Sequence, residues 1–94
     1  MVSGVYEGGL KVWDAAFDLV DFVAANADIF KGKRVLELGC GQGLPGVMAM
    51  KVGASHTIFQ DFNEEVLTKA TKAVIETNVV GVSADSYSLV PGAW

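Results

Sequence analysis

Residues 34–46, which read Arg-Val-Leu-Glu-Leu-Gly-Cys-Gly-Gln-Gly-Leu-Pro-Gly, decide the fold of this chain. The stretch opens with a short apolar run that carries one acid, Glu37. It continues with glycines at three alternate positions, which are Gly39, Gly41 and Gly43. Glycines let the backbone turn tightly and let a ligand approach closer than any Cβ would allow. Pro45 suits the first turn of a helix, so the pattern predicts a strand, a glycine turn and a helix whose N-terminus faces a ligand.

The spacing of these glycines separates two classes of ligand. Gly41–Gly46 taken alone matches the dinucleotide fingerprint G-x-G-x-x-G. In that fingerprint the first glycine directly follows the strand, and in this chain that glycine is Gly39. Counted from Gly39, the third glycine position holds Leu44, so the match to the dinucleotide fingerprint fails. The remaining pattern, acid-x-Gly-x-Gly-x-Gly, resembles motif I of the seven-strand, Rossmann-like methyltransferases, which bind S-adenosylmethionine. A nicotinamide-dependent oxidoreductase and a purely structural glycine turn remain as alternatives.

Helical and strand patterns alternate along the rest of the chain. Helices are predicted over Val12–Ala25, from about Pro45 to Val52, and from the N-cap Asn63 to Thr77-Asn78. Strands are predicted over Arg34–Leu38, Thr57–Gln60 and, more weakly patterned, Ser86–Val90. Strands that alternate with helices imply a parallel sheet with right-handed crossovers. The predicted fold class is α/β, a Rossmann-like methyltransferase fold truncated to about three parallel strands with flanking helices.

Two of the predicted helices have an apolar face at helical spacing. The first face comprises Ala15, Ala16, Leu19, Val20 and Val23, with Asp14, Asp18 and Asp21 on a solvated face. The second face comprises Val66, Leu67, Ala70, Ala73 and Val74. Outside these helices, His56 is predicted to be an exposed loop residue and Cys40 a small residue in a tight loop.

Composition limits the classes of protein that fit. The chain has 94 residues, enough for one small domain, and 51% of them are hydrophobic. No apolar run approaches the roughly 18 residues of a membrane span, and the start is not patterned as a signal peptide. A net charge of −4 without a Lys/Arg cluster argues against a nucleic-acid surface. One His and one Cys leave no zinc site, and one Cys cannot form an internal disulfide.

An acid ends the second predicted strand, where it would lie beside the glycine turn. Asp61 can accept hydrogen bonds from both hydroxyls of a ribose, as the comparable acid does in dinucleotide folds. Gln60, next to it, has two open interpretations, as a cofactor contact and as an inert strand-end residue. Asp61 and Glu37 also have purely structural interpretations, as a strand-end acid and as a cap of the glycine turn.

Three segments sharpen the resemblance: Ser3–Trp13, the core at Val35–Gly46, and Phe59–Asn63. All three are similar to the protein-histidine methyltransferases, and Tyr-Glu-Gly-Gly-Leu-Lys and Phe-Gln-Asp-Phe-Asn are the strings that separate this group from the related lysine methyltransferases. The resemblance implies that Glu37 lies near the cationic methionine end of the cofactor, that Trp13 packs beside it, and that Trp94 lines the adenine pocket. The candidate cofactor-binding residues are therefore Trp13, Glu37, Gly39, Gly41, Gly43, Gln60, Asp61 and Trp94.

The same resemblance implies an activity and a partner. The expected reaction is S-adenosylmethionine-dependent N-methylation of a protein histidine, with a large-subunit ribosomal protein as substrate, in the cytoplasm, the nucleus or both. No metal, nucleic-acid or membrane partner is expected, and oligomeric state is not assigned.

The chain also departs from the family. Ala73-Val74 replace a Pro-Asn pair. Family members begin earlier and continue through four more strands, so residues 1–94 are expected to form one incomplete domain, with the catalytic residues beyond Trp94. An inactive fragment that only binds cofactor or a partner chain is the alternative.

Overall fold

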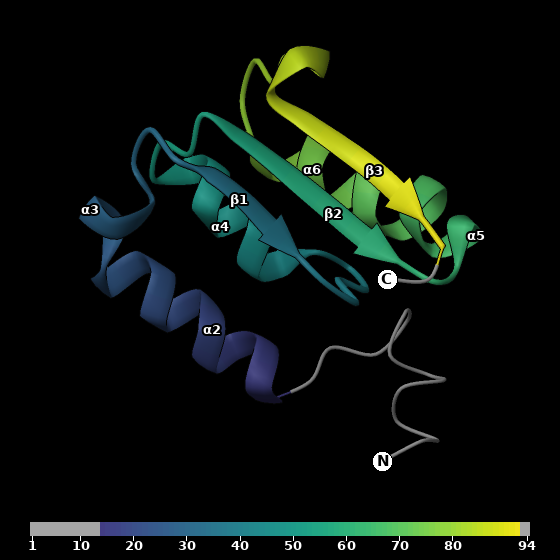
Figure 1. Ribbon diagram of the computed structural model, residues 1–94, viewed down its shortest axis with the longest axis horizontal. Helices are drawn as coiled ribbons and strands as arrows, with labels where there is room; N and C mark the ends of the chain where they lie inside the picture. Colours follow the sequence, from purple (N-terminus) through teal and green to yellow (C-terminus); the bar gives the residue numbers. More distant parts are fainter. Residues whose placement is uncertain (1–13, 93–94) are drawn as a thin grey trace.

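The computed structural model describes residues 14–92, which form a sheet of three parallel strands with helices packed against it (Figure 1). The strands are β1 (Arg34–Glu37), β2 (His56–Asp61) and β3 (Tyr87–Pro91), adjacent in that order. The helices are α2 (Asp14–Ala25), α3 (Ala27–Phe30), α4 (Leu44–Lys51), α5 (Glu64–Val66) and α6 (Lys72–Asn78). A π-helical turn, η1 (Leu67–Thr71), joins α5 to α6, and a 3₁₀ turn, η2 (Ala84–Ser86), precedes β3. The predicted α/β fold with a parallel sheet is confirmed.

The strands follow one another across the sheet in the order β1, β2, β3, so both connections lead to the next strand on the same side. Right-handed crossovers of this kind place their helices on the same face. Accordingly α4 contacts β1 and β2, η1 contacts β2 and β3, and α2 packs against α4. In Figure 1 α4 and α6 lie behind the strands, so the described residues cover one face of the sheet with helices.

The core lies between the sheet and these helices. Phe59 of β2, Leu67 of η1 and Ile75 of α6 are almost completely buried there. Helix α4 approaches the sheet so closely that a Cβ on Gly46 would lie 2.3 Å from Cε1 of Phe59. A glycine is therefore required at this helix–sheet contact.

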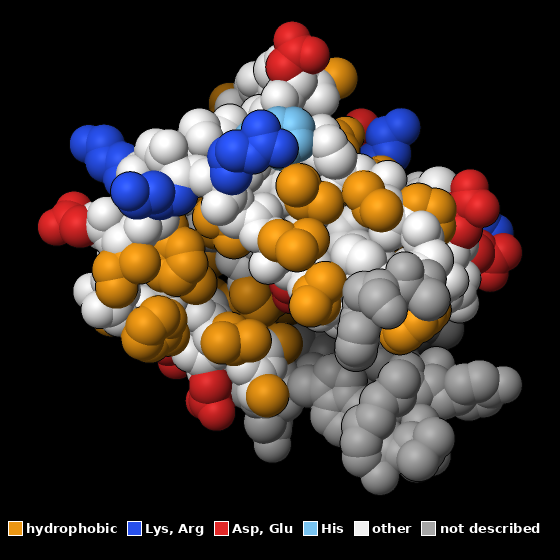
Figure 2. All heavy atoms as spheres, in the orientation of Figure 1, with side chains coloured by type: hydrophobic (Ala, Val, Ile, Leu, Met, Phe, Trp, Pro, Cys, Tyr) orange, Lys and Arg blue, Asp and Glu red, His pale blue; other side chains and the backbone are white. Residues whose placement is uncertain are grey.

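The opposite face of the sheet is apolar and exposed. Successive side chains of a strand point to opposite faces of the sheet. Since Glu37 contacts Gly46 of α4, its neighbour Leu36 points away from the helices. Leu36 is 57% exposed, and Val90 of β3 and Leu38 after β1 are 43% and 50% exposed. Figure 2 shows hydrophobic side chains gathered over the strands on this face. We refer to Leu36, Ile58 and Val90 as the open sheet face.

The apolar face predicted for α2 is only partly correct. Val23 is buried and Ala16 and Val20 are half-buried, whereas Ala15 and Leu19 are exposed. Helix α2 contacts the rest of the protein mainly through α4, so α4 covers only a narrow strip of the surface of α2. The predicted solvated positions Asp18 and Asp21 are exposed.

The face predicted for the helix after β2 shifts register at the π turn. Val66 and Leu67 are buried as predicted, but Ala73 is exposed, and Thr71 and Ile75 are the fully buried positions. A π turn closes its hydrogen bond over five residues instead of four, so it rotates the residues that follow relative to an ideal α-helix. Beyond Leu67 the predicted face is correct in part, because Ala70 and Val74 are half-buried and Val74 packs against the core.

The prediction of an exposed loop at His56 is wrong. His56 is the first residue of β2, and it pairs in register with Arg34 of β1. Its Nδ1 lies 2.9 Å from the carbonyl oxygen of Asp85, and its Nε2 lies 2.8 Å from Oγ of Ser88. The ring therefore ties β2 to η2 and β3. Within residues 14–92, no helix is long and apolar enough to cross a membrane.

Candidate functional site

The glycine turn between β1 and α4 adopts a backbone that side chains disfavour. The φ angles of Gly39, Gly41 and Gly43 are +57°, +55° and +81°. Each of the three alternate glycines thus occupies the left-handed region, which an L residue enters only with strain. Their spacing in the sequence is explained by the shape of this turn, whatever it binds.

Gln60 of β2 holds the first part of the glycine turn. Its side-chain Oε1 accepts a hydrogen bond from the N–H of Gly39 at 2.8 Å, and its Nε2 donates to the carbonyl of Gly92. Its main-chain oxygen accepts from the N–H of Cys40 at 2.8 Å. Gln60 is 5% exposed. It joins the glycine turn to the end of β3, which is a structural role, and a contact with cofactor remains a prediction.

Asp61 holds the next part of the turn. Its Oδ2 accepts from the N–H of Gly41 at 2.9 Å, and its Oδ1 accepts from the N–H of Asn63 at 3.0 Å. Asp61 is half-buried, and each carboxylate oxygen has lone pairs beyond the one used here. The carboxylate can therefore anchor the turn and still accept hydrogen bonds from a ligand.

Asn63 begins the helix that follows Asp61. Its Oδ1 accepts from the N–H groups of Glu65 at 3.0 Å and Val66 at 3.3 Å. The predicted N-cap is confirmed. The same residue therefore starts the helix and, through its own N–H, binds Oδ1 of Asp61.

Glu37 ends β1 on the helical side of the sheet. Its Oε1 accepts from the N–H of Gly46, at 2.9 Å, in the first turns of α4. Burial raises the pKa of Glu37 to about 7, the negative charge of Asp61 adds to the rise, and the hydrogen bond from Gly46 opposes it. A carboxyl group with this pKa exchanges its proton near neutral pH, and a cation placed beside it would favour the charged form. Glu37 therefore ties the end of β1 to the first turn of α4. Roles in holding the glycine turn and beside the methionine end of a cofactor remain predictions.

Two buried residues complete the support of the turn. Oγ1 of Thr71 donates to the carbonyl of Gly41, and Sγ of Cys40 lies 3.8 Å from the same Oγ1. Burial, with the charge of Glu37, raises the pKa of the Cys40 thiol to about 12, so Cys40 is a packed thiol without nucleophilic character. The sequence-based prediction missed Thr71, because a threonine at helical spacing gives no signal that it faces a turn thirty residues earlier.

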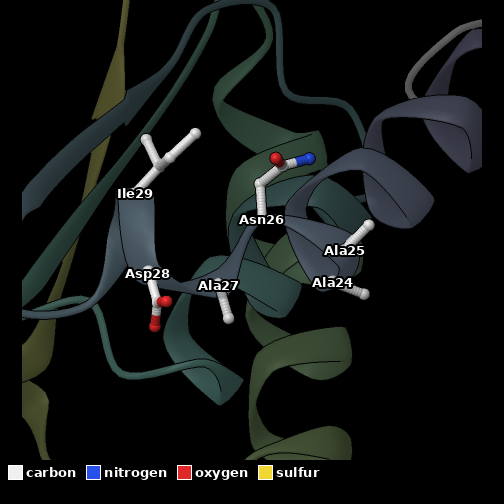
Figure 3. A pocket seen from close by; sticks show the side chains of 6 residues that line it. All are labelled: Ala24, Ala25, Asn26, Ala27, Asp28 and Ile29. Carbon is white, nitrogen blue, oxygen red and sulfur yellow. The ribbon is translucent and has the colours of Figure 1, made fainter.

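The remaining predicted residues lie elsewhere. Trp13 and Trp94 lie outside the described residues. Within residues 14–92, no group of three or more His, Cys, Asp or Glu residues could hold a metal ion. A shallow hollow of about 280 Å³ lies at the junction of α2 and α3 (Figure 3). Its lining side chains splay in different directions, with Asp28 and Ile29 pointing apart, so it offers no convergent set of polar groups.

The parallel sheet, the glycine turn and the acid at the end of the neighbouring strand define a Rossmann-like α/β protein. A family model described as lysine methyltransferase matches residues 3–89, and the chain belongs to this family. Two curated relatives, both histidine protein methyltransferase 1 homologs, carry the name of the histidine group. The Bos taurus homolog is 47% identical over 78 residues, which cover 83% of this chain and 21% of that protein. The Dictyostelium discoideum homolog is 37% identical over the whole chain, which covers 29% of that protein.

A solved structure supports the same class. The chain is similar to the Trypanosoma brucei PRMT1 enzyme-prozyme heterotetrameric complex with AdoHcy. The TM-score is 0.71 at 29% identity, and the match covers 95% of this chain and 26% of the other. The chain thus spans less than a third of each of these three relatives, and the match falls on a Rossmann-like methyltransferase fold.

Proposed function

We propose that the chain is the cofactor-binding part of an S-adenosylmethionine-dependent protein-histidine N-methyltransferase. The observation that carries the proposal is the hydrogen bond between the N–H of Gly41 and Oδ2 of Asp61, at 2.9 Å. It joins the glycine turn to the acid across adjacent strand ends, where α/β sheets bind nucleotides. The relatives named as histidine protein methyltransferases support the reaction class.

Each site residue takes a distinct part in this proposal. The glycine turn lets the cofactor approach the backbone, and Asp61 accepts hydrogen bonds from its ribose hydroxyls. Glu37 faces the cationic end, where positive charge favours the ionised carboxylate. When bound, S-adenosylmethionine would supply an electrophilic sulfonium methyl group for transfer to a substrate nitrogen, with S-adenosylhomocysteine as the leaving group. The protein contributes orientation and exclusion of water, and no described residue is assigned as general base.

The finer parts of the proposal concern the substrate. We infer a protein histidine as the methyl acceptor, in a large-subunit ribosomal protein, with the reaction in the cytoplasm, the nucleus or both. Its support is the similarity to the histidine group, whose members are named for a protein substrate.

Calorimetric titration of the 94-residue chain with S-adenosylhomocysteine tests cofactor binding, with NAD as control. The control is needed because Gly46 packs against Phe59 as closely as the third glycine of a dinucleotide fingerprint would. We expect saturable binding of S-adenosylhomocysteine that NAD does not displace. Displacement by NAD but not by S-adenosylmethionine would favour the nicotinamide-dependent oxidoreductase.

Asp61→Asn provides an internal test, because it keeps the shape of the side chain and removes its charge. We expect affinity to fall by about 1.5–3 kcal/mol, the contribution of hydrogen bonds to a charged group. Asp85→Asn is the matched control, since Asp85 is exposed in η2, before β3 begins. Equal affinity of both variants would remove Asp61 from the site.

One observation favours the alternative that this chain acts only by binding cofactor or a partner chain. The open sheet face exposes apolar side chains of β1 and β3, which a lone domain seldom leaves uncovered. Sedimentation analysis of the chain, with Leu36→Lys as a variant on this face, distinguishes this alternative from the proposed methyltransferase function. The alternative would be favoured by three results together: the chain binds cofactor, it associates through this face, and it methylates no histidine substrate.

A further inference from the structure

Thr71 lies in the π turn that separates α5 from α6. The N–H of Lys72 bonds to the carbonyl of Leu67, five residues earlier, which closes this wider turn. Single π turns inside helices occur frequently at functional sites. Within this turn Thr71 is completely buried and faces the glycine turn, whereas Ala70 is half-buried.

Both ends of the Thr71 side chain meet the glycine turn. Its Oγ1 donates to the carbonyl of Gly41 and lies 3.4 Å from the carbonyl of Val66 in its own helix. Its methyl carbon Cγ2 would lie 3.0 Å from a Cβ on Gly43. Thr71 therefore restricts the turn by a hydrogen bond, and its methyl group leaves little room for a side chain at Gly43.

The hydrogen bond from Thr71 complements the one from Asp61. Oδ2 of Asp61 accepts from the N–H of Gly41, and Oγ1 of Thr71 donates to the carbonyl of the same residue. Gly41 is thus held on both of its backbone polar groups, by two different elements. Glycine has the largest conformational freedom of any residue, so an unrestrained turn would spend much of its time in other shapes.

We propose that Thr71 is a positioning residue of the cofactor site, which keeps the glycine turn in its binding shape through the carbonyl of Gly41. The inference rests on the proposed function. A ligand that binds one shape of a turn loses affinity in proportion to the time the turn spends in others. Thr71 thereby contributes to affinity although its buried hydroxyl is satisfied by the protein itself.

Thr57 offers a matched control for Thr71. Both threonines are completely buried, but Oγ1 of Thr57 has no hydrogen-bond partner among the described residues. Replacement by valine keeps the shape of either side chain and removes the hydroxyl. We expect Thr71→Val to raise the dissociation constant of S-adenosylhomocysteine about fivefold to tenfold, the equivalent of one lost hydrogen bond. Thr57→Val should leave that constant unchanged, and Thr71→Ser, which restores the hydroxyl, should recover most of the affinity.

A second measurement separates positioning from general loss of stability. The N–H of Gly43 donates to the carbonyl of Cys40 at 2.8 Å inside the turn. Its hydrogen exchange should speed up in Thr71→Val and stay unchanged in Ile75→Val, which weakens the core on α6 but removes no hydrogen bond of the turn. Should Thr71→Val fail to fold, Thr71→Ala replaces it in the same comparison.

The outcomes distinguish the inference from the function on which it rests. Absence of binding by the wild-type chain would overturn the proposed function, and the inference with it. Wild-type binding with unchanged affinity in Thr71→Val would overturn the inference alone. Equal losses of affinity in Thr71→Val and Ile75→Val, in step with stability, would also overturn it.

Discussion

Glu37→Gln should make the protein more stable at neutral and alkaline pH. Burial at the end of β1 raises the pKa of the Glu37 carboxyl from 4.5 to about 7, with a further contribution from the charge of Asp61. The charged form is therefore the unfavourable one in the folded protein. Glutamine is neutral at every pH, and its side-chain oxygen can still accept the hydrogen bond that Gly46 donates to Oε1 of Glu37.

The sign of the pH dependence follows from proton binding. Between pH 4.5 and about 7 the folded protein holds a proton on Glu37 that the unfolded chain has lost. The free energy of unfolding of the wild type must therefore fall as pH rises through this window. A difference between 4.5 and about 7 corresponds to about 3 kcal/mol, at about 1.4 kcal/mol per pH unit. The stability of Glu37→Gln relative to wild type should rise by this amount across the window and stay level above it.

Urea unfolding of both proteins, from about pH 4 to about pH 8, measures this difference. Glu76→Gln, at an exposed position of α6, is the control that removes a glutamate without changing the buried site. The contributions of carboxylates away from Glu37 are common to wild type and variant, so they cancel in the difference. Parallel curves for wild type and Glu37→Gln, with no divergence up to pH 8, would refute the assignment of a buried, readily protonated acid at Glu37.

Two further predictions concern the neighbourhood of the glycine turn. Gly46→Ala should lower the free energy of unfolding by about 1–3 kcal/mol in urea titrations, because its Cβ would lie 2.3 Å from the buried ring of Phe59; unchanged stability would mean that α4 can move away from the sheet. Cys40, with a pKa of about 12 and 6% exposure, should react with iodoacetamide more than about a hundredfold more slowly in the folded protein than in urea, and comparable rates would show that the turn opens readily.

Local chemistry made much of the fold predictable. Glycines at alternate positions followed by Pro45 indicated a turn that leads into a helix, and these glycines have positive φ with α4 beginning at Leu44. Asn63 indicated a helix start because its side chain can accept from the N–H groups of the first turn, and it does so. Such features depend on neighbours in the chain, so a sequence displays them directly.

Features that depend on distant partners escaped prediction. The π turn after β2 shifted the buried positions to Thr71 and Ile75, and nothing in residues 67–71 announces it. His56 was predicted as a loop residue because its hydrogen-bond partners, Asp85 and Ser88, lie about thirty residues away. Helix α2 packs mainly against α4, which leaves Leu19 exposed although its spacing is that of a core position.

The same division applies to the site. The sequence by itself determined the strand, glycine turn and helix around Glu37, with an acid at the end of the next strand, because turn geometry and strand ends follow from residue type. Only the tertiary structure decided how these parts are joined. Asp61 and Thr71 hold the two polar groups of Gly41, and Gln60 ties Gly39 to Gly92. Hydrogen bonds between segments twenty to thirty residues apart exist only once parallel pairing has brought the strand ends together, which is why no local pattern could reveal them.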